Sequence, residues 1–428
     1  MNLQQLFNAK TTENGDLAFS KASMNPLINI LFMTEYFQNH LDKVPEIGTS
    51  EEAQLFARFI RDPRHGLGRR DLGRCLMAMA NVPMDKIIAS GRADDIFYQR
   101  FSIEGFHATL DYLKTEVEKG NELVKKWMPR YSSKRLFLAR QIAKYWGMDK
   151  QQYGHFIKCS TTPEFKLSHK NTGAINFEHL PSLALLKYWN RFATGKDTKE
   201  RFKEYLEAVK AGKADLKVST TTVYDIYRNR DKIDADLCLS KIEKINLNCL
   251  PIIDVSGSMF NSNDSIGKAL PIGHYLAKCS TYCPDSFVTF SHNPELVQLT
   301  GANYREQLET IRKSNWGMNT DFGAVMRLLQ NLGTFPDYLV VLSDMEFDVG
   351  SFSSKAALEK LWKENGYTTK IVWWNLNSRG TTAPEMDDMG NIFLSGYSPM
   401  LLKFLSVNFD AKAFLDILLA EYKKAIKE

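Results

Sequence analysis

The sequence predicts an α-helical repeat domain followed by a doubly wound α/β domain, on three observations. In the first 245 residues, apolar side chains recur at the three- and four-residue spacing of a helix, and alternating strand patterns are nearly absent. After that point, short apolar runs typical of buried parallel strands alternate with helical patterns. The length of 428 residues exceeds what one hydrophobic core usually serves. We therefore expect two domains, at residues 1–245 and 246–428.

The helical part consists of short amphipathic segments separated by helix breakers. Examples of the helical pattern lie at 27–37 and 136–146, and breakers such as Pro63, Gly120 and Pro129 fall between the segments. This alternation predicts a stack of helix pairs of the HEAT-like kind. The sequence contains no strict repeat, so this geometry is inferred from the pairing of helices and not from a detected period.

The composition is that of an ordinary globular protein. Hydrophobic residues make up 44% of the chain and charged residues 25%, which excludes a disordered, collagen-like or coiled-coil chain. The N-terminal stretch lacks the basic and apolar regions of a secretory signal, and no apolar run approaches the ~18 residues of a membrane span. Six cysteines without a CxxC pair are typical of reduced thiols. These features predict a cytoplasmic protein without a membrane partner.

The net charge of +5 hides an asymmetry between the two parts of the chain. Residues 1–250 hold 39 Lys and Arg against 30 Asp and Glu, and the remainder holds 16 against 20. A basic part beside an acidic part favours binding of a polyanion to the first and of a cation to the second. The alternative is that these charges are scattered over solvated helix faces.

Strands and helices alternate in the second domain. The expected strands are Leu247–Asp254, Ser286–Phe290, Tyr338–Leu342 and Lys370–Asn375. The expected helices are Ile266–Cys279, Tyr304–Arg312, Phe322–Leu332 and Lys355–Glu364. In doubly wound sheets, ligands bind beyond the carboxyl ends of the strands, so the loops that follow the strands are the expected position of a site.

Three oxygen-rich loops are predicted to meet at that edge of the sheet. Asp254, Ser256 and Ser258 follow the first strand in a tight, glycine-containing loop, Thr320 precedes a helix, and Asp344 follows a buried strand. Carboxylate and hydroxyl oxygens in this pattern suit one hard cation, Mg²⁺ or Mn²⁺. Because only two of the five are carboxylates, a position is left for water or for an acidic group of a partner. Taken singly, each residue has a structural explanation as a helix cap or a turn residue.

The DxSxS loop, followed by a later Thr and a still later Asp, resembles the metal-ion-dependent adhesion site (MIDAS) of von Willebrand factor A domains. The resemblance implies that the Asp and the two Ser of the loop coordinate the metal, that the Thr binds it directly or through water, and that the later Asp lies on the third loop. The motifs GMNTDF at 317–322 and SDMEFD at 343–348 further resemble an uncharacterised group of intracellular A-domain proteins of plants, protists and large viruses or phages.

The segment Arg61–Asp71, RDPRHGLGRRD, resembles the basic, glycine-spaced segment of the Ro ribonucleoprotein family. In that family a ring of helical repeats, the TROVE domain, is closed by an A domain, and the order of domains here is the same. The resemblance implies a TROVE-like domain at 1–245, an A domain at 246–428, and RNA as the ligand of the helical part.

Two basic segments supply the candidate RNA-binding residues. In the first, arginines surround two glycines that would let the backbone approach a phosphate, although ion pairing with Asp62, Asp71 and other helices explains them equally well. In the second, cations alternate with Trp127 and Tyr131, which could stack on unpaired bases or lie in the core of a helix junction. The candidates are Arg61, Arg64, Arg69, Arg70, Lys125, Lys126, Arg130, Lys134 and Arg135.

The sequence favours a binding protein over an enzyme, because it contains no Ser/His/Asp set, no recognisable pair of catalytic acid and base and no Walker loop. In the leading hypothesis the helical domain binds RNA and the metal recruits an acidic residue of a protein partner. One alternative is a protein–protein scaffold or virion-associated structural protein with the same metal site and no RNA. Another is a metal-dependent hydrolase in which Glu346 or Asp348 is the general base.

Overall fold

We describe the protein from a computed structural model. The structure describes residues 10–11, 17–18, 25–314, 322–344, 366, 368–376, 385–386, 392–395, 404 and 411–428, apart from positions 33, 64, 91–92, 100–102, 161, 170, 219–220, 243, 263, 291–292 and 334. Contacts between residues divide the chain into two compact units, each of which we describe by itself. The sheet unit comprises Met1–His40 and Thr221–Ile417, and the helical unit comprises Leu41–Thr220 and Leu418–Glu428.

This grouping follows contacts and does not show which segments fold independently. The predicted domain boundary between residues 245 and 246 therefore remains a prediction. The contacts do place the helices from Thr221 onward with the sheet, and the last residues of the chain with the helical unit.

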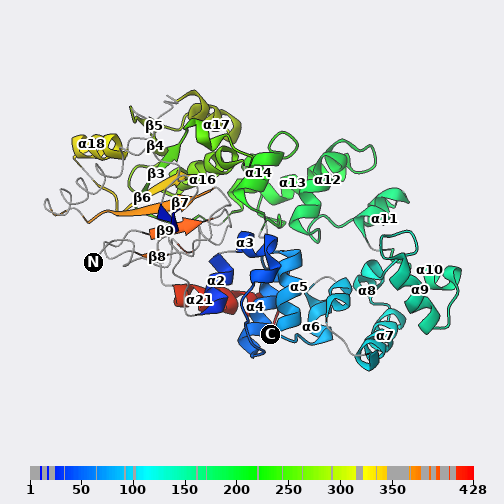
Figure 1. The fold of residues 1–428 in the computed structure, drawn as a ribbon. Helices are drawn as coiled ribbons and strands as arrows, with labels where there is room; N and C mark the ends of the chain where they lie inside the picture. The colour runs from blue at the N-terminus through cyan, green and yellow to red at the C-terminus, as the bar shows by residue number, and fades with distance from the viewer. Residues whose placement is uncertain are drawn as a thin grey trace. The chain divides into compact units, whose positions relative to one another are not determined.

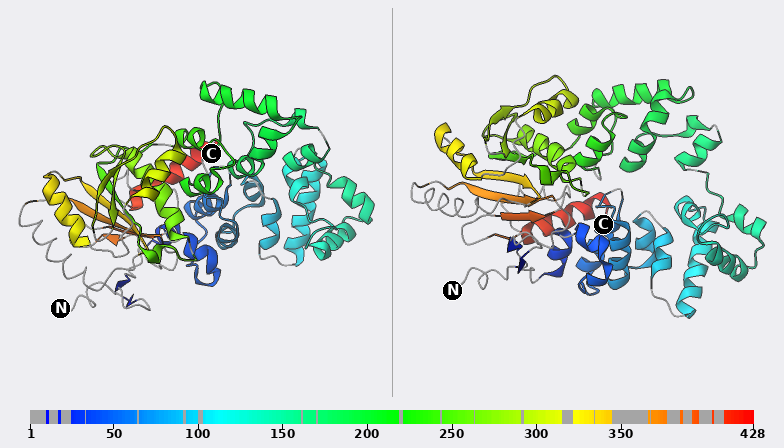
Figure 2. Two further views of the ribbon diagram at one scale, coloured as in Figure 1. Left: turned by 90° about the horizontal axis from the view of Figure 1, so that it is seen from above. Right: turned by 45° about the horizontal axis from the view of Figure 1, so that its top comes forward.

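Helices joined by short turns make up the described part of the helical unit (Figure 1). They are η1 (Leu41–Lys43), α4 (Glu51–Arg61), α5 (Arg70–Met79), α6 (Met84–Ala89), η2 (Ala93–Tyr98), α7 (Ile103–Glu118), α8 (Glu122–Trp127), α9 (Leu136–Tyr145), α10 (Lys150–Phe156), α11 (Pro163–Ser168), η3 (Thr172–Ala174), α12 (Ser182–Thr194) and α13 (Lys199–Lys210). In both views of Figure 2 they succeed one another in chain order, from blue to green. The described residues of this unit contain no strand, which confirms the predicted helical character. The HEAT-like repeat geometry stays a prediction.

The helix α4 illustrates why this part of the chain is helical. Ser50 precedes it, and the Ser50 Oγ accepts the backbone N–H of Ala53 at 3.1 Å. Glu51 in the first turn places a negative charge at the positive end of the helix dipole. Phe56 and Ile60, one turn apart, are fully buried. The local caps and the apolar stripe thus favour the same helix.

A seven-stranded sheet organises the described residues of the sheet unit, in the order β5-β4-β3-β6-β7-β9-β8. Its strands are β3 (Cys249–Asp254), β4 (Ser286–Phe290), β5 (Leu296–Gln298), β6 (Tyr338–Ser343), β7 (Lys370–Asn375), β8 (Glu385–Met386) and β9 (Ile392–Ser395). Neighbouring strands pair in parallel from β4 to β9, and only β5 and β8, at the two edges, are antiparallel. The predicted mostly parallel sheet is confirmed, and all four predicted strands are present. The short strands β5, β8 and β9, and the pair β1 (Lys10–Thr11) and β2 (Leu17–Ala18), were not predicted.

Three of the predicted helices lie in the described part of the sheet unit, and each agrees with its predicted bounds to within one residue at each end. They are α16 (Ser265–Cys279), α17 (Tyr304–Lys313) and α18 (Phe322–Leu332). The sheet unit also contains helices for which no bounds were predicted: α2 (Pro26–Phe32), α3 (Thr34–Asn39), α14 (Val223–Asn229), α15 (Ala235–Ser240), η4 (Gly257–Met259) and the first half of α21 (Ala411–Ala425). The predicted helix Lys355–Glu364 lies outside the described residues.

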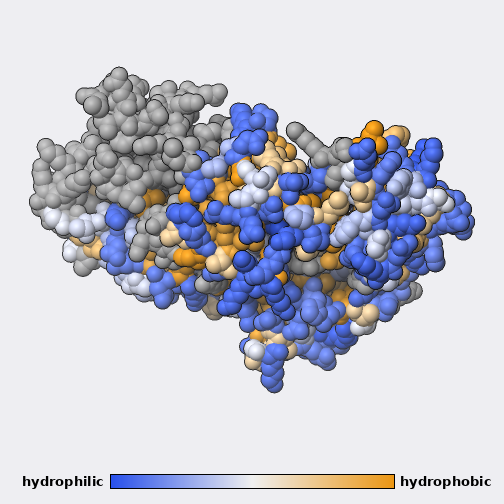
Figure 3. All heavy atoms as spheres, turned by 90° about the horizontal axis from the view of Figure 1, so that it is seen from below, coloured by the Kyte–Doolittle hydropathy of each residue, from blue (hydrophilic) through white to orange (hydrophobic). Residues whose placement is uncertain are grey.

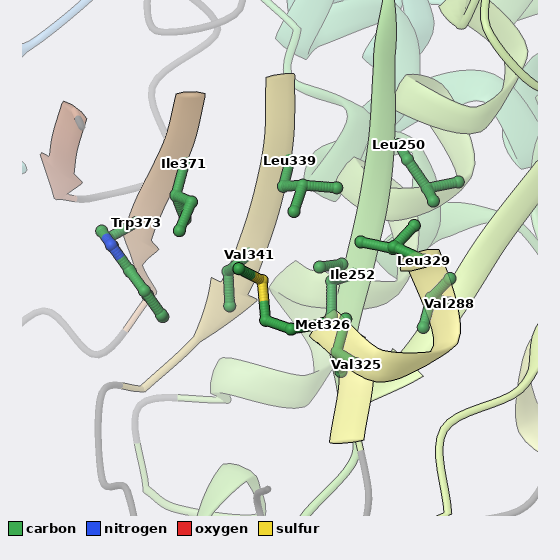
Figure 4. Close-up of a cluster of buried hydrophobic side chains, with 10 residues drawn as sticks. All are labelled: Leu250, Ile252, Val288, Val325, Met326, Leu329, Leu339, Val341, Ile371 and Trp373. Carbon is green, nitrogen blue, oxygen red and sulfur yellow. The ribbon is translucent and has the colours of Figure 1, made fainter. Parts of the chain in front are cut away.

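One face of the sheet packs against α18. Figure 4 shows side chains of this helix pointing toward apolar side chains from four neighbouring strands. Where a strand contributes two of these residues, they are two positions apart, which places them on the same face. The cluster consists of Leu250, Ile252, Val288, Val325, Met326, Leu329, Leu339, Val341, Ile371 and Trp373.

The opposite face of the sheet is covered by α16. A Cβ added to Gly273 of α16 would lie 2.4 Å from the Ile253 Cδ1 and 3.4 Å from the Leu342 Cδ1, so the helix backbone approaches β3 and β6 closely. Ile253 and Leu342 alternate with the residues that face α18. Helices therefore lie on both faces, and the central strands are apolar on both sides because neither side meets water.

On the face drawn in Figure 3, hydrophilic side chains (blue) cover much of the described surface and hydrophobic atoms (orange) lie between them. Among the residues that the structure describes, no helix combines the length and the apolar character that crossing a membrane requires.

A buried histidine makes the stability of the sheet unit depend on pH. His274 of α16 is 4% exposed, and its Nε2 donates to the Gln307 Oε1 at 2.7 Å. Burial lowers the pKa of His274 to about 4, so the unfolded chain binds the proton more strongly than the folded chain. Stability is expected to fall as the pH falls from about 6.5 to 4, by up to ~3 kcal/mol, and to level off above that range. Urea denaturation at a series of pH values measures this slope.

The control for this prediction is His274→Gln, which keeps a polar side chain and removes the titrating ring. Between pH 4 and 6.5 the free energy of unfolding of this variant is expected to depend less steeply on pH, because the contribution of the histidine is gone. An identical slope in the variant would contradict the assignment to His274.

Candidate functional site

The buried carboxylate of Asp254 forms the centre of the candidate metal site. Asp254 is the last residue of β3 and is fully buried. Its Oδ1 accepts the backbone N–H of Ser256 at 2.9 Å, and its Oδ2 accepts the hydroxyl of Ser343 at 2.6 Å. The carboxylate is therefore held in one orientation by two donors, one from the loop after β3 and one from the end of β6.

The loops after β3 and β6 meet, as the sequence predicted for neighbouring parallel strands. The Oγ atoms of Ser256 and Ser258 lie 3.0 Å apart, and the Ser258 hydroxyl donates to the Asp344 Oδ1 at 3.3 Å. Asp344 is 4% exposed and directly follows β6. Since β3 and β6 are hydrogen-bonded neighbours, their carboxyl ends bring four of the five predicted ligands together. The fifth, Thr320, lies outside the described residues, as do Glu346 and Asp348.

Two residues of this site were not among the predicted ligands. Ser343 donates to Asp254, as described above. The Nδ2 of Asn261 lies 3.1 Å from the Ser258 carbonyl oxygen and 3.4 Å from the Asp344 Oδ2. The sequence offered a weak indication of Asn261, since a polar amide follows the DxSxS loop closely. Only the fold brings it to Asp344.

The electrostatics of the site favour a cation. The pKa of Asp254 is raised to about 6, mainly by burial and also by the negative charge of Asp344, although hydrogen bonds from Ser343 and Ser256 act in the opposite direction. No described side chain forms an ion pair with Asp254. A buried carboxylate close to a second one is costly unless a positive charge compensates it.

The donor set fits a hard divalent cation. It consists of two carboxylates and two hydroxyls, which are the oxygen ligands that Mg²⁺ and Mn²⁺ prefer. In the part of the chain that the structure describes, no group of three or more His, Cys, Asp or Glu side chains gathers to hold a metal. The two carboxylates and two hydroxyls are too few to fill an octahedral site alone, so water or further donors would complete it.

The first basic segment is largely structural in this fold. Arg61 is fully buried, and its Nε lies 2.7 Å from the Asp95 Oδ2, at an angle that does not suit a hydrogen bond, so charge holds the pair together. Arg74 pairs with Asp95 at 2.5 Å and with Asp94 at 2.8 Å. Burial and the charge of Asp95 raise the pKa of Asp94. The guanidinium of Arg61 is therefore not at a surface where a phosphate could reach it, and the ion-pairing alternative describes its environment.

The glycines of this segment also pack against protein. A Cβ added to Gly66 would lie 1.9 Å from the carbonyl oxygen of Phe59, and one added to Gly73, two residues after the segment, would lie 2.6 Å from the Arg61 Cβ. Gly68 has a φ of +67°, which glycine adopts without strain. The backbone at these glycines therefore lies close to α4. The sequence had suggested that it would approach a phosphate instead. The remaining predicted residues of the segment are Arg69, which is half-buried, Arg70, which is exposed, and Arg64, which lies outside the described residues.

The second basic segment is more accessible. Arg130 and Lys134 are exposed, and Lys126 is half-buried with its Nζ 5.2 Å from the centroid of the Trp127 ring. Lys125 pairs with Glu122 at 3.2 Å. Arg135 instead pairs with the buried ion cluster of Arg61, Arg74, Asp94 and Asp95, since its Nη1 lies 3.4 Å from Asp94.

Two families match parts of the chain. One, described as a domain of unknown function (DUF7788), matches residues 248–416, which include the sheet and its oxygen-rich loops. The other, also described as a domain of unknown function (DUF2828), matches residues 146–241. Neither description states an activity.

Particular proteins are similar to the chain over longer stretches. The uncharacterized protein L728 of Acanthamoeba polyphaga mimivirus is 27% identical over an alignment of 330 residues that covers 66% of this chain and 57% of that relative. The match thus spans little more than half of the relative's length. The crystal structure of the Deinococcus radiodurans RO (RSR) protein has a TM-score of 0.41 and 12% sequence identity, over 97% of this chain and 96% of that one.

Proposed function

We propose that this protein is a non-enzymatic binding protein whose sheet unit holds Mg²⁺ or Mn²⁺ and presents the ion to an acidic group of a partner. The observation that supports the proposal is the convergence of two buried carboxylates and two hydroxyls from adjacent loops, at Asp254, Ser256, Ser258 and Asp344. The proposal also includes Thr320 as a ligand of the ion, as the resemblance to the metal site of A domains implies. When bound, the ion supplies a positive charge with open coordination positions that a carboxylate can fill.

The test is a calorimetric titration of the full chain with Mn²⁺. Asp254→Asn keeps the shape of the side chain and removes its charge, so the affinity is expected to fall at least about tenfold. The matched control is Asp337→Asn, which removes an exposed carboxylate just before β6, at the opposite end of that strand. Equal affinity in both variants and in the unchanged protein would refute the metal proposal.

Nucleic-acid binding by the helical unit is the second candidate function. It is favoured by the exposed cations of the second basic segment and by Lys126 over the Trp127 ring. The same metal site without nucleic acid would instead define a protein–protein scaffold or a structural component of a virion. A hydrolase would need a general base such as Glu346 or Asp348, both outside the described residues.

Filter binding to single-stranded RNA over a salt series separates these candidates. Replacing Lys126 and Lys134 together by Ala is expected to weaken binding and to make the log–log salt dependence less steep by about 0.7 per lost phosphate contact. The control is the double replacement of Lys199 and Lys203, which are exposed on α13. No retention of RNA at low salt would leave the scaffold as the function of the helical unit.

A further inference from the structure

A cavity of about 330 Å³ opens in the helical unit between the turn that follows α8 and the helix α10. The helices α8, α9 and α10 lie next to one another in Figure 1. The volume is at the lower end of the range for small-ligand pockets, about 300–1,000 Å³, and suits a ligand of one nucleotide. The cavity is lined by Arg130, Tyr131, Ser132, Lys150, Tyr153, Gly154 and Ile157.

The walls of this cavity are fixed by packing and hydrogen bonds. Tyr153 of α10 is fully buried and its hydroxyl donates to the carbonyl oxygen of Pro129 at 2.9 Å, which ties the helix to the turn. Within the turn, the backbone N–H of Ser133 donates to the carbonyl oxygen of Arg130 at 3.0 Å. The cavity therefore exists before any ligand binds.

The charge that lines the cavity is positive and unpaired. Arg130 and Lys150 are exposed, and neither forms an ion pair with any residue that the structure describes. No acidic residue is among those that line the cavity. Two cations that face one cavity without a carboxylate are suited to a phosphate.

The cavity also offers an aromatic wall. Tyr131 is half-buried, its ring meets that of Tyr153 edge to face at 5.9 Å, and the Lys150 Nζ lies 6.0 Å from the centroid of the Tyr131 ring. A Cβ added to Gly154 would meet no heavy atom within 4 Å, so the α10 side of the cavity is open. A planar base can therefore lie against Tyr131 beside the cations.

We propose that this cavity binds a nucleoside phosphate, with the phosphate between Arg130 and Lys150 and the base against Tyr131. The ligand is either a free nucleotide or one unit of a single strand of nucleic acid. The inference deepens the second candidate function and, for the strand, rests on it.

The experiment titrates the full chain at low salt by calorimetry with AMP, with a short single-stranded RNA oligonucleotide and with inorganic phosphate. Gly154→Glu places a carboxylate in the open side of the cavity, where it neutralises the cations and repels phosphate. Binding of AMP and of the oligonucleotide is expected to weaken at least about tenfold. Gly154→Ala is the matched control, and circular dichroism checks that both variants fold. Tyr131→Leu is expected to weaken AMP and leave inorganic phosphate unchanged.

The outcomes separate the two sources and the two proposals. If the unchanged protein binds AMP and Gly154→Glu loses that binding, the result supports a free nucleotide. If the unchanged protein binds the oligonucleotide but not AMP, and Gly154→Glu loses the oligonucleotide, the result supports a strand. Absence of binding to the unchanged protein, or binding that Gly154→Glu leaves intact, overturns the inference. Oligonucleotide binding that survives Gly154→Glu and is lost with Lys126 and Lys134 overturns the cavity while nucleic-acid binding stands. If inorganic phosphate binds as tightly as AMP, the proposed contact between the base and Tyr131 is wrong.

Discussion

Replacing Asp95 by Asn is expected to lower the free energy of unfolding by about 3–5 kcal/mol. Asp95 is fully buried in η2 and faces the guanidinium groups of Arg61 and Arg74. Removing its charge leaves Arg61 buried and uncompensated, because no other carboxylate among the described residues pairs with it. A buried charge without a partner is far more costly than the loss of an exposed ion pair. Urea denaturation of the variant and the unchanged protein measures the difference.

The control for this prediction is Asp71→Asn in the neighbouring helix. Asp71 is 43% exposed, and it pairs with Arg70 at 3.3 Å and with Arg74 at 3.5 Å. Water screens these pairs, so the expected loss is at most about 1 kcal/mol. A loss for Asp95→Asn no larger than that for Asp71→Asn would contradict the structural role assigned to the buried cluster.

Replacing Gly66 by Ala is expected to cost about 3 kcal/mol, the upper end of what overpacking usually costs. The added Cβ would lie 1.9 Å from the carbonyl oxygen of Phe59, and a backbone atom of a helix cannot move aside as the tip of a side chain can. The same carbonyl accepts the backbone N–H of Leu67 at 2.9 Å, so a shift would also break that hydrogen bond. Thermal or urea denaturation gives the measurement.

Gly154→Ala is the matched control for Gly66→Ala. Gly154 lies inside α10 with open space around its missing Cβ, so Ala is expected to raise stability by about 0.5–1 kcal/mol through helix propensity. The pair also tests the interpretation of the basic segment. If Gly66→Ala left stability unchanged and weakened RNA binding, the glycine would contact RNA and not α4.

The two basic segments show where sequence patterns are ambiguous. Arginines spaced by glycines and aspartates fit both a phosphate site and a buried ion cluster, because the same charges serve either purpose. Asp94 and Asp95, which decide the matter for Arg61 and Arg74, lie beyond the segment in sequence and reach it only through the packing of η2.

The candidate metal site was more predictable because local rules place its parts. Asp254 and Asp344 each come directly after an apolar strand, and the carboxyl ends of neighbouring parallel strands share one edge. What the sequence could not state is that β3 and β6 are neighbours. They are separated by more than eighty residues, and β4 also pairs with β3. The contributions of Ser343 and Asn261 depend on that neighbour relation.

The amino-acid sequence by itself determined the order of the two kinds of structure, the four main strands and the candidate metal ligands. These follow from periodicities of two and 3.6 residues and from polar residues at strand ends, which act over a few neighbours. The tertiary structure alone decided that Arg61 is buried, that Gly66 packs against Phe59, and that Tyr131 and Lys150 border one cavity. Burial and pairing between distant segments depend on which elements pack together, and that choice minimises the free energy of the whole unit and not of any one segment.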